Sequence, residues 1–247
     1  MPVRGCQTKI LIDEWDLSGD SNSVNLTADV AVLDYVTFQN CFQQRLPGLP
    51  MSSIAHTGYF SGPGAGEMEE ELHARLGSGN DVIVGIILGT ALTAPVGYCL
   101  RTAFNQQLRL NAPVAELITV DGNWSGNTAE GLQRGLQVAL ATAEDSTGAV
   151  GSGADFGAAG SAGGRVFVFV QDIGGTATDA VIKLQSDSDS NFGTAADEAT
   201  ITFSAVGGYS AALSGTVNRY LRAYIDDLGG ADDISFVMVA CVAGVTQ

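Results

Sequence analysis

The chain has 247 residues, enough for one large β domain or two domains of ordinary size, and 15% of them are charged, against about 25% in a typical soluble domain. So few charges indicate that much of the surface is hidden against copies of the same chain. Aspartate and glutamate number 27 and lysine and arginine 11, and the net charge of -16 excludes nucleic-acid binding through a basic patch.

The first long strand is predicted from an alternation of apolar and polar residues. Five apolar residues recur at every second position: Val24, Leu26, Ala28, Val30 and Val32. Their side chains share one face of a half-buried strand, because successive side chains of a strand point to opposite faces. A polar-aromatic segment, residues 36–49, ends in Pro-Gly-Leu and predicts an extended loop, followed by a strand from Met51 to Phe60.

One short α-helix is expected at about residues 67–77. Met68, Leu72 and Leu76 stand at four-residue spacing and form one apolar stripe. Four glutamates crowd the first turn, where the helix dipole favours negative charge, and Gly77 ends the helix.

The glycine-rich segment before this helix, residues 61–66, imitates a phosphate-binding loop. Its glycine spacing does not give Gly-x-Gly-x-x-Gly, and no Lys-Ser or Lys-Thr follows. The glutamates of the first helical turn would repel a phosphate, so the segment is interpreted as a plain loop.

The rest of the chain is read as short strands separated by turn residues. Candidate strands are residues 81–88, 96–104, 106–110 and 114–124, with turns expected at Asp121-Gly122 and Ser125-Gly126. After a segment dense in Gly, Ala and Ser, strands are expected at residues 165–171, 180–185, 199–203, 209–213, 219–224 and 234–241. The run from Arg165 to Gln171 fits a buried strand.

The predicted fold class is all-β: a β-sandwich or barrel with one short α-helix and a second, C-terminal β-sandwich portion. The expected domains are residues 1–128, a Gly/Ala/Ser-rich connection over residues 129–163, and residues 164–247. Whether the Gly-rich connection is flexible or a poorly packed part of a sheet stays open at this point.

No catalytic or cofactor-binding residues are predicted. A weak imitation of a calcium loop is formed by Asp187, Asp189, Asn191 and Glu198, but Phe192 stands where the sharp turn needs Gly, and a solvated turn is the better interpretation. The acidic pairs at residues 226–227 and 232–233 show no sign of a desolvated general acid. His56 and His73 belong to no Ser/His/Asp or Cys/His pattern, so structural or surface roles are expected.

The cysteines suggest no disulfide scaffold. They are scattered, with no Cys-x-x-Cys pair, and are expected to be reduced thiols that pack as small hydrophobes: Cys6, Cys41, Cys99 and Cys241. No signal peptide is expected, and the longest apolar runs are too short to span a bilayer.

The order of strands and turns resembles that of a known family. Three N-terminal pieces carry the resemblance, residues 13–20, 23–34 and 45–49, and four C-terminal pieces follow in the same order, residues 164–170, 181–187, 215–222 and 234–237. In this order they resemble the tail tube (major tail) proteins of long-tailed bacteriophages, over residues 9–124 and 164–242.

The resemblance implies a structural virion protein and not an enzyme. Subunits of such proteins form rings, usually of six copies, that join edge to edge and stack into a tube, and DNA passes through the lumen without specific binding. The implied partners are other copies of the chain, the tape measure protein, and tail terminator and baseplate proteins. The implied location is the virion tail, assembled in the bacterial cytoplasm. The candidate ring–ring contacts lie in the extended loop: Phe38, Phe42, Arg45 and Leu46.

The acidic balance predicts a net-negative lumen that DNA does not grip. Two other functions stay open. One is a capsid decoration or fibre-like attachment protein, with the C-terminal sandwich as the adhesive part, and the other is a carbohydrate-active enzyme on a β-sandwich.

Overall fold

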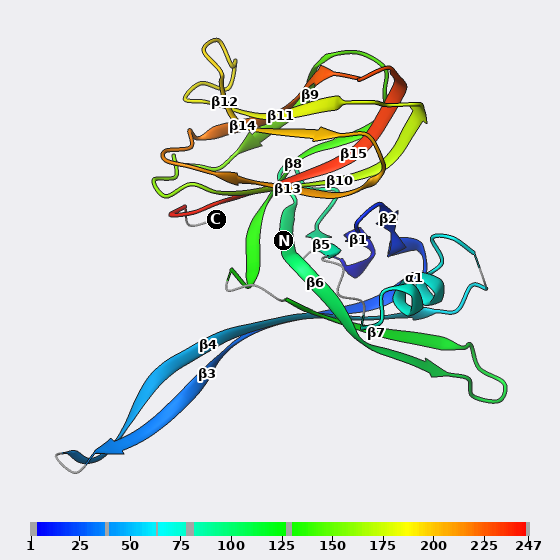
Figure 1. The fold of residues 1–247 in the computed structure, drawn as a ribbon, viewed down its shortest axis with the longest axis vertical. Coiled ribbons are helices and arrows are strands. Elements are labelled where there is room, and N and C mark those ends of the chain that lie inside the picture. The colour runs from blue at the N-terminus through cyan, green and yellow to red at the C-terminus, as the bar shows by residue number, and fades with distance from the viewer. Residues whose placement is uncertain (1–3, 38–39, 63, 78–81, 127–129, 246–247) are drawn as a thin grey trace. The chain divides into compact units, whose positions relative to one another are not determined.

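The computed structural model describes residues 4–37, 40–62, 64–77, 82–126 and 130–245. Antiparallel β-strands make up most of this part of the chain, and one short α-helix, α1 (Met68–Ala74), accompanies them. The prediction of an all-β protein with one short helix is confirmed (Figure 1). Among the described residues, no helix combines the length and the apolar character that a bilayer crossing needs.

Contacts between Cα atoms divide the chain into two compact units. Unit 1 is formed by Met1–Gly19, Val82–Cys99 and Gln133–Gln247, and unit 2 by Asp20–Asp81 and Leu100–Leu132. The predicted boundaries at residues 128 and 163 follow the chain linearly and stay a prediction. Within residues 129–163, where a connection was expected, the structure has two strands, β8 (Leu132–Glu144) and β9 (Gly148–Asp155).

Unit 1 contains two sheets. The larger has the strand order β13-β10-β15-β8-β6-β5-β1-β2 and the smaller the order β12-β11-β14-β9. Besides β8 and β9, its strands are β1 (Thr8–Ile12), β2 (Trp15–Asp16), β5 (Val82–Leu88), the first part of β6 (Val96–Asn111), β10 (Gly164–Gly175), β11 (Ala180–Asp187), β12 (Ala196–Phe203), β13 (Gly207–Leu213), β14 (Tyr220–Asp227) and β15 (Ala231–Val242). Two short 3-10 helices, Gly5–Gln7 and Leu17–Gly19, flank β1 and β2.

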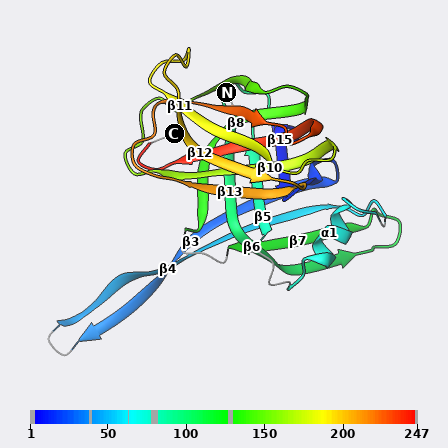
Figure 2. The ribbon, with the colours of Figure 1, turned by 45° about the horizontal axis from the view of Figure 1, so that its top comes forward.

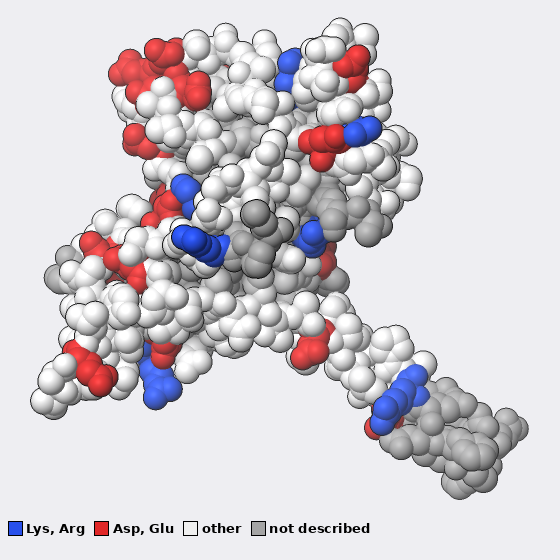
Figure 3. All heavy atoms as spheres, turned by 180° about the vertical axis from the view of Figure 1, so that it is seen from behind, with Lys and Arg blue, Asp and Glu red and all other residues white. Residues whose placement is uncertain are grey.

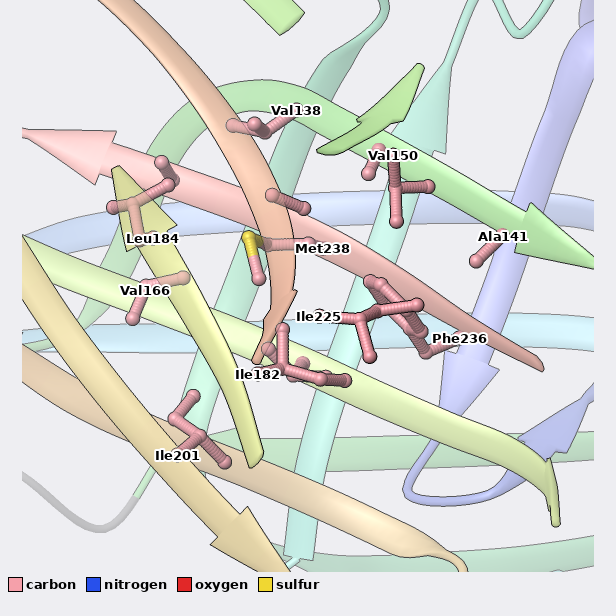
Figure 4. Packing of buried hydrophobic residues seen from close by; sticks show 14 of the residues in the cluster. Val138, Ala141, Val150, Val166, Ile182, Leu184, Ile201, Ile225, Phe236 and Met238 are labelled. Carbon is pink, nitrogen blue, oxygen red and sulfur yellow. The ribbon is translucent and has the colours of Figure 1, made fainter. Parts of the chain in front are cut away.

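The centre of unit 1 is formed by β10 and β15, which pair along their length and are buried on both faces. Val166, Val168 and Val170 point into one apolar cluster, and Phe167 and Phe169 point into another on the opposite side. The first cluster joins the two sheets through residues of the smaller one, as Figure 4 shows for Ile182, Leu184, Ile201 and Ile225. The expected buried strand and C-terminal β-sandwich are therefore confirmed.

The second cluster packs β10 and β15 against strands that come early in the chain. It includes Leu11 of β1, Ile83 and Ile87 of β5 and Cys99 of β6. A Cβ atom on Gly85 would lie 2.5 Å from Cζ of Phe169, so the glycine makes room for the ring. Of the cysteines, Cys99 and Cys241 are buried as expected, Cys6 is exposed, and the side chain of Cys41 lies outside the described residues.

Unit 2 is a sheet of four antiparallel strands in the order β3-β4-β7-β6. Its strands are β3 (Ser21–Thr37), β4 (Asn40–Tyr59), β7 (Thr119–Gly126) and the part of β6 (Val96–Asn111) that begins at Leu100. The turns expected at Asp121-Gly122 and Ser125-Gly126 are wrong, because these residues lie inside β7. Gly122 belongs in the strand because a Cβ atom there would lie 2.5 Å from both the His56 imidazole and Leu72.

Helix α1 covers one face of this sheet. Met68 and Leu72 are fully buried, and the side-chain amide of Asn105 donates a 2.8 Å hydrogen bond to the Leu72 carbonyl. The helix ends before Leu76, which is 45% exposed and forms a single bridge with Asn105, so only the first two residues of the predicted stripe are buried. Gly77 follows with a φ of 63°, in the left-handed region that favours glycine.

Candidate assembly surface

The loop predicted for residues 36–49 is wrong, because residues 36–37 and 40–49 belong to the two strands of a long β-hairpin. β3 and β4 pair from Ser21–Gly58 to Thr37–Asn40, whereas β4 pairs with β7 only from Ser53 onward. In the described part of the chain, residues 28–37 of β3 and 40–52 of β4 therefore form a two-stranded ribbon without a third strand, visible in Figures 1 and 2. We call residues 28–52 of this hairpin the arm. An isolated two-stranded hairpin is at best marginally stable in water, so such an arm needs a partner.

The apolar face of β3 extends beyond the part of the strand that the rest of the chain buries. Val24 and Leu26, which pair with the buried His56 and Ile54, are half-buried, as the alternation predicted. On the arm the same face continues with Val30 and Val32, which are 51% and 62% exposed. A pattern typical of burial thus continues where the isolated chain offers nothing to bury it.

Other large apolar side chains of the arm are exposed as well: Leu33, Leu46 and Met51. Leu33 and Leu46 are cross-strand partners and therefore lie on one face of the ribbon. Figure 3 shows mainly uncharged atoms over the described part of the arm. Exposed apolar side chains gathered on one element in this way are candidates for protein–protein contact.

The predicted contact residues fall on this arm. Arg45 and Leu46 are exposed, and the Arg45 side chain forms a 3.2 Å ion pair with its cross-strand neighbour Asp34. Phe42 lies in β4, but its side chain and all of Phe38 are outside the described residues. Their role as ring–ring contacts stays a prediction.

A bulge gives the arm a defined local geometry. Val30 pairs with Pro50 and Val32 with Pro47, so β4 holds one residue more than β3 in this interval. A Cβ atom on Gly48 would lie 2.9 Å from the Ala31 carbonyl oxygen, so the two strands approach too closely for any other residue. The two prolines also leave this stretch of β4 short of N–H donors.

Two sheet edges of unit 2 have no neighbouring strand among the residues that the structure describes. Among these residues, β3 pairs with β4 alone. Ala103–Asn111 of β6 pairs with β7 on one side, and on the other side its described contact is the bridge from Asn105 to Leu76. An unpaired edge presents N–H and C=O groups that can pair with a strand of another chain.

The face of this sheet opposite α1 is lined mainly by polar residues. The register places on it Ser23, Asn25 and Thr27 of β3, Ser53, Ala55 and Thr57 of β4, Asp121, Asn123 and Ser125 of β7, and Phe104, Gln107 and Arg109 of β6. The two charged residues of this set, Asp121 and Arg109, are cross-strand partners. This face is therefore polar and close to neutral.

The covered face holds a buried histidine, which lies in a strand as expected. His56 is 2% exposed, and neither ring nitrogen has a hydrogen-bond partner among the described residues. Burial lowers the pKa of His56 from 6.5 to about 4, against the smaller opposing effect of Asp121. The imidazole thus packs as a neutral group beneath α1. His73 lies exposed on the helix, as predicted.

The glycine-rich loop before α1 uses its N–H groups internally. Gly64 N–H donates 2.8 Å to the Glu70 carboxylate, and Gly66 N–H donates 3.2 Å to that of Glu71. Glu67 accepts a hydrogen bond from the Ser61 hydroxyl. These carboxylates occupy donors that a phosphate would need, which supports the interpretation as a plain loop.

The calcium-loop imitation closes a hairpin between β11 and β12. The buried Asp187 carboxylate accepts the backbone N–H groups of Thr194, at 2.8 Å, and Asp189, and these bonds lower the pKa of Asp187. Asn191 donates to Asp189, and Glu198 accepts a hydrogen bond from Ser186. In the described part of the chain, no group of three or more His, Cys, Asp or Glu side chains has a metal-binding arrangement.

A different surface lies on the exposed face of the smaller sheet of unit 1. The Arg222 guanidinium lies over the Phe192 ring, 4.5 Å from its centre, and donates a 3.0 Å hydrogen bond to Gln185. Lys183 pairs with both Asp197 and Asp226, so the acidic pair at residues 226–227 contributes to an ion-pair network.

Comparison with known proteins adds similarities of fold. No family model and no curated protein matches the sequence. A chain of the PVC sheath–tube complex, an extracellular contractile injection system in its extended state, is 14% identical and matches 55% of this chain and 92% of its own length, with a TM-score of 0.43. A chain from the virion of a native gene transfer agent particle is 10% identical, over 53% of this chain and 97% of its own, with a TM-score of 0.42. The SPP1 Dit protein, described as a paradigm of the hub adsorption apparatus in phages that infect Gram-positive bacteria, is 11% identical over 94% of this chain and 98% of its own, with a TM-score of 0.36.

Proposed function

We propose that this chain is a structural virion protein, the subunit of a phage tail tube that polymerises into stacked rings around a channel for DNA. The observation that best supports this proposal is the apolar stripe of β3. The stripe continues onto the arm as Val30 and Val32, which are exposed in the isolated chain. Such a stripe favours a protein whose fold is completed by its neighbours. The role is mechanical and not enzymatic.

In this proposal the unit 2 sheets of neighbouring subunits join edge to edge, with β3 of one copy beside residues 107–111 of β6 in the next. Pairing satisfies the hydrogen-bonding groups of both edges. A closed ring, expected to be hexameric, leaves no edge unpaired. The sheet face opposite α1 would line the channel.

A wall built from that face would be nearly neutral, since Asp121 and Arg109 offset each other. The net-negative lumen expected from composition would then depend on residues beyond this sheet. Small hydroxyl and amide side chains would let DNA pass without the phosphate contacts that lysine and arginine make. The further partners in this proposal are the tape measure, tail terminator and baseplate proteins, with assembly in the bacterial cytoplasm and a final location in the virion tail.

Negative-stain electron microscopy of the purified protein over a range of concentrations tests the proposal. We expect rings or tubes with a hollow lumen. A sedimentation profile that stays monomeric at the highest concentration, together with no tubes in the virion, would contradict it.

The alternative is a capsid decoration or fibre-like attachment protein, and one observation favours it. The exposed face of β11 and β14 presents Arg222 over Phe192 beside Tyr224, a combination of aromatic and hydrogen-bonding groups that suits adhesion. The same microscopy distinguishes the two, because an attachment protein gives knobs on capsids or fibres and no hollow tubes.

A further inference from the structure

A second exposed apolar surface lies in unit 2, at the end of the sheet away from the arm. It consists of residues 110–118, which connect β6 to β7, and the end of β4. Six exposed side chains form it: Tyr59, Phe60, Leu110, Val114, Leu117 and Ile118. We call this surface the end patch. Val114 is 98% exposed and Leu117 is 67% exposed, so neither side chain belongs to the core of its own chain.

The end patch is anchored to the sheet. The Phe60 N–H donates a 3.0 Å hydrogen bond to the Ile118 carbonyl, and Tyr59 pairs with Thr119. Leu110 pairs with the buried Val120. The apolar side chains are thus presented from the ends of three paired strands.

The arm cannot reach the end patch of its own chain. β4 runs from the tip of the arm at Asn40 to the end patch at Tyr59 as one strand of 20 residues. At about 3.3 Å per residue, Pro50 and Pro47, the partners of Val30 and Val32, lie roughly 30–40 Å from Tyr59 along this strand. Two exposed apolar surfaces that one strand holds apart can meet only between molecules.

Charge permits this contact between copies of an acidic chain. The arm carries Asp29 and Asp34, of which Asp34 pairs with Arg45, and Glu116 is the one charged residue within residues 110–118. Each surface therefore has a net charge of -1, although the chain carries -16. Asp29 lies on the opposite face of β3 from Val30 and Val32, so contact through the two valines does not require Asp29 to face Glu116.

We propose that the end patch receives the arm of a second copy of this chain, with Val30 and Val32 packing against Val114 and Leu117. The contact joins two different surfaces, head to tail, so each copy keeps one free arm and one free end patch and the contact repeats. This inference rests on the proposed tube and names the surface that receives the arm.

Two variants with neutral substitutions test it, since added charge would disturb any association. The arm variant carries Val30→Ser and Val32→Ser, and the end-patch variant carries Val114→Ser and Leu117→Ser. Each variant alone should fail to form long assemblies in analytical ultracentrifugation and negative stain. Rings of the two variants mixed in equal amounts should stack in pairs, because one ring still has intact arms and the other has intact end patches.

The matched control is Leu140→Ser, a substitution of an exposed leucine in unit 1, which should assemble like the wild type. Circular dichroism and urea unfolding must show that both variants fold. Tubes formed equally well by the folded end-patch variant, or a mixture of rings in which no stacked pairs appear, would overturn the contact while leaving the tube proposal standing. A wild-type chain that forms no assembly at all would contradict the tube proposal itself.

Discussion

Two pairs of strands in this molecule use the same kinds of side chain in opposite ways. β10 and β15 carry apolar residues on both faces, and every one of Val166 to Val170 is fully buried within the chain. On the arm, β3 and β4 also carry apolar residues on both faces, yet Val32 and Leu33 are more than half exposed. Apolar residues on a strand therefore do not by themselves form a core. Whether they are buried depends on the layers that pack against the strand. The first pair has its cover within the chain, and the second pair needs another molecule.

The largest effect is expected where β10 is covered on both sides. Phe169→Ala should lower the free energy of unfolding by about 3–5 kcal/mol, because it leaves a cavity between β10 and β5. Urea unfolding measures this loss. The exposed Leu140→Ala is the matched control and should change the stability by less than about 1 kcal/mol. A loss below about 1 kcal/mol for Phe169→Ala would show that the early strands do not close over β10.

The stability of the fold should depend on pH because His56 is buried on the face of the unit 2 sheet that α1 covers. His56 has a pKa of about 4 in the folded chain and 6.5 as its ordinary value. As the pH falls from 6.5 to 4, the unfolded chain binds a proton that the folded chain excludes, so stability falls by about 3 kcal/mol and the loss levels off below pH 4.

Urea unfolding at pH 7 and pH 4.5 measures this loss. His56→Gln should remove most of the dependence in this window, whereas His73→Gln, on the exposed side of α1, should keep it. An unchanged pH dependence in His56→Gln would mean that water reaches the imidazole.

A smaller effect is expected from adding one methyl group beneath α1. Gly122→Ala would place its Cβ 2.5 Å from His56 and Leu72, and displacing the helix should cost about 1–3 kcal/mol. Gly193→Ala is the control, because nothing lies within 4 Å of its Cβ position. Hydrogen exchange of the α1 amides should accelerate in the first variant alone. Equal stability of the two variants would place α1 farther from the sheet.

The smallest effect on stability is expected on the arm. Val30→Ser and Val32→Ser together should change the free energy of unfolding by less than about 1 kcal/mol, since both side chains are already largely in water. The same variant should lose assembly. A stability loss of several kcal/mol, of the kind seen for core truncations, would mean that the arm folds back on its own chain.

The features that sequence predicts well here are those with an unambiguous local pattern. The Val-Phe run of β10 could be recognised as a buried strand, and the apolar spacing of Met68 and Leu72 as a helix face. The arm's tip was mistaken for a loop because Pro47 and Gly48, common turn residues, stand here in a bulge. Asp121-Gly122 was mistaken for a turn because packing against His56, and not turn geometry, requires that glycine.

The candidate site could be predicted in part. Residues 36–49 were predicted as a contact segment but as a loop, and the end patch was missed, because residues 114–124 look like one apolar strand and the strand begins only at Thr119. The Gly-rich segment also hid two strands. β9 has glycines with positive φ at positions 148, 151 and 153, and a Cβ on Gly153 would lie 2.5 Å from the Leu221 carbonyl oxygen. Such backbone requirements depend on a partner strand that local sequence does not identify.

The two edges of the arm differ in a way that bears on aggregation. Within residues 40–52, β4 contains Pro47 and Pro50, which donate no hydrogen bond to an added strand, whereas β3 has no proline over its 17 residues. A strand can therefore be added readily along one side of the ribbon and is disfavoured along the other. Free subunits waiting for assembly are thus protected from stacking their arms into the two-sided, unlimited sheets of an amyloid-like deposit.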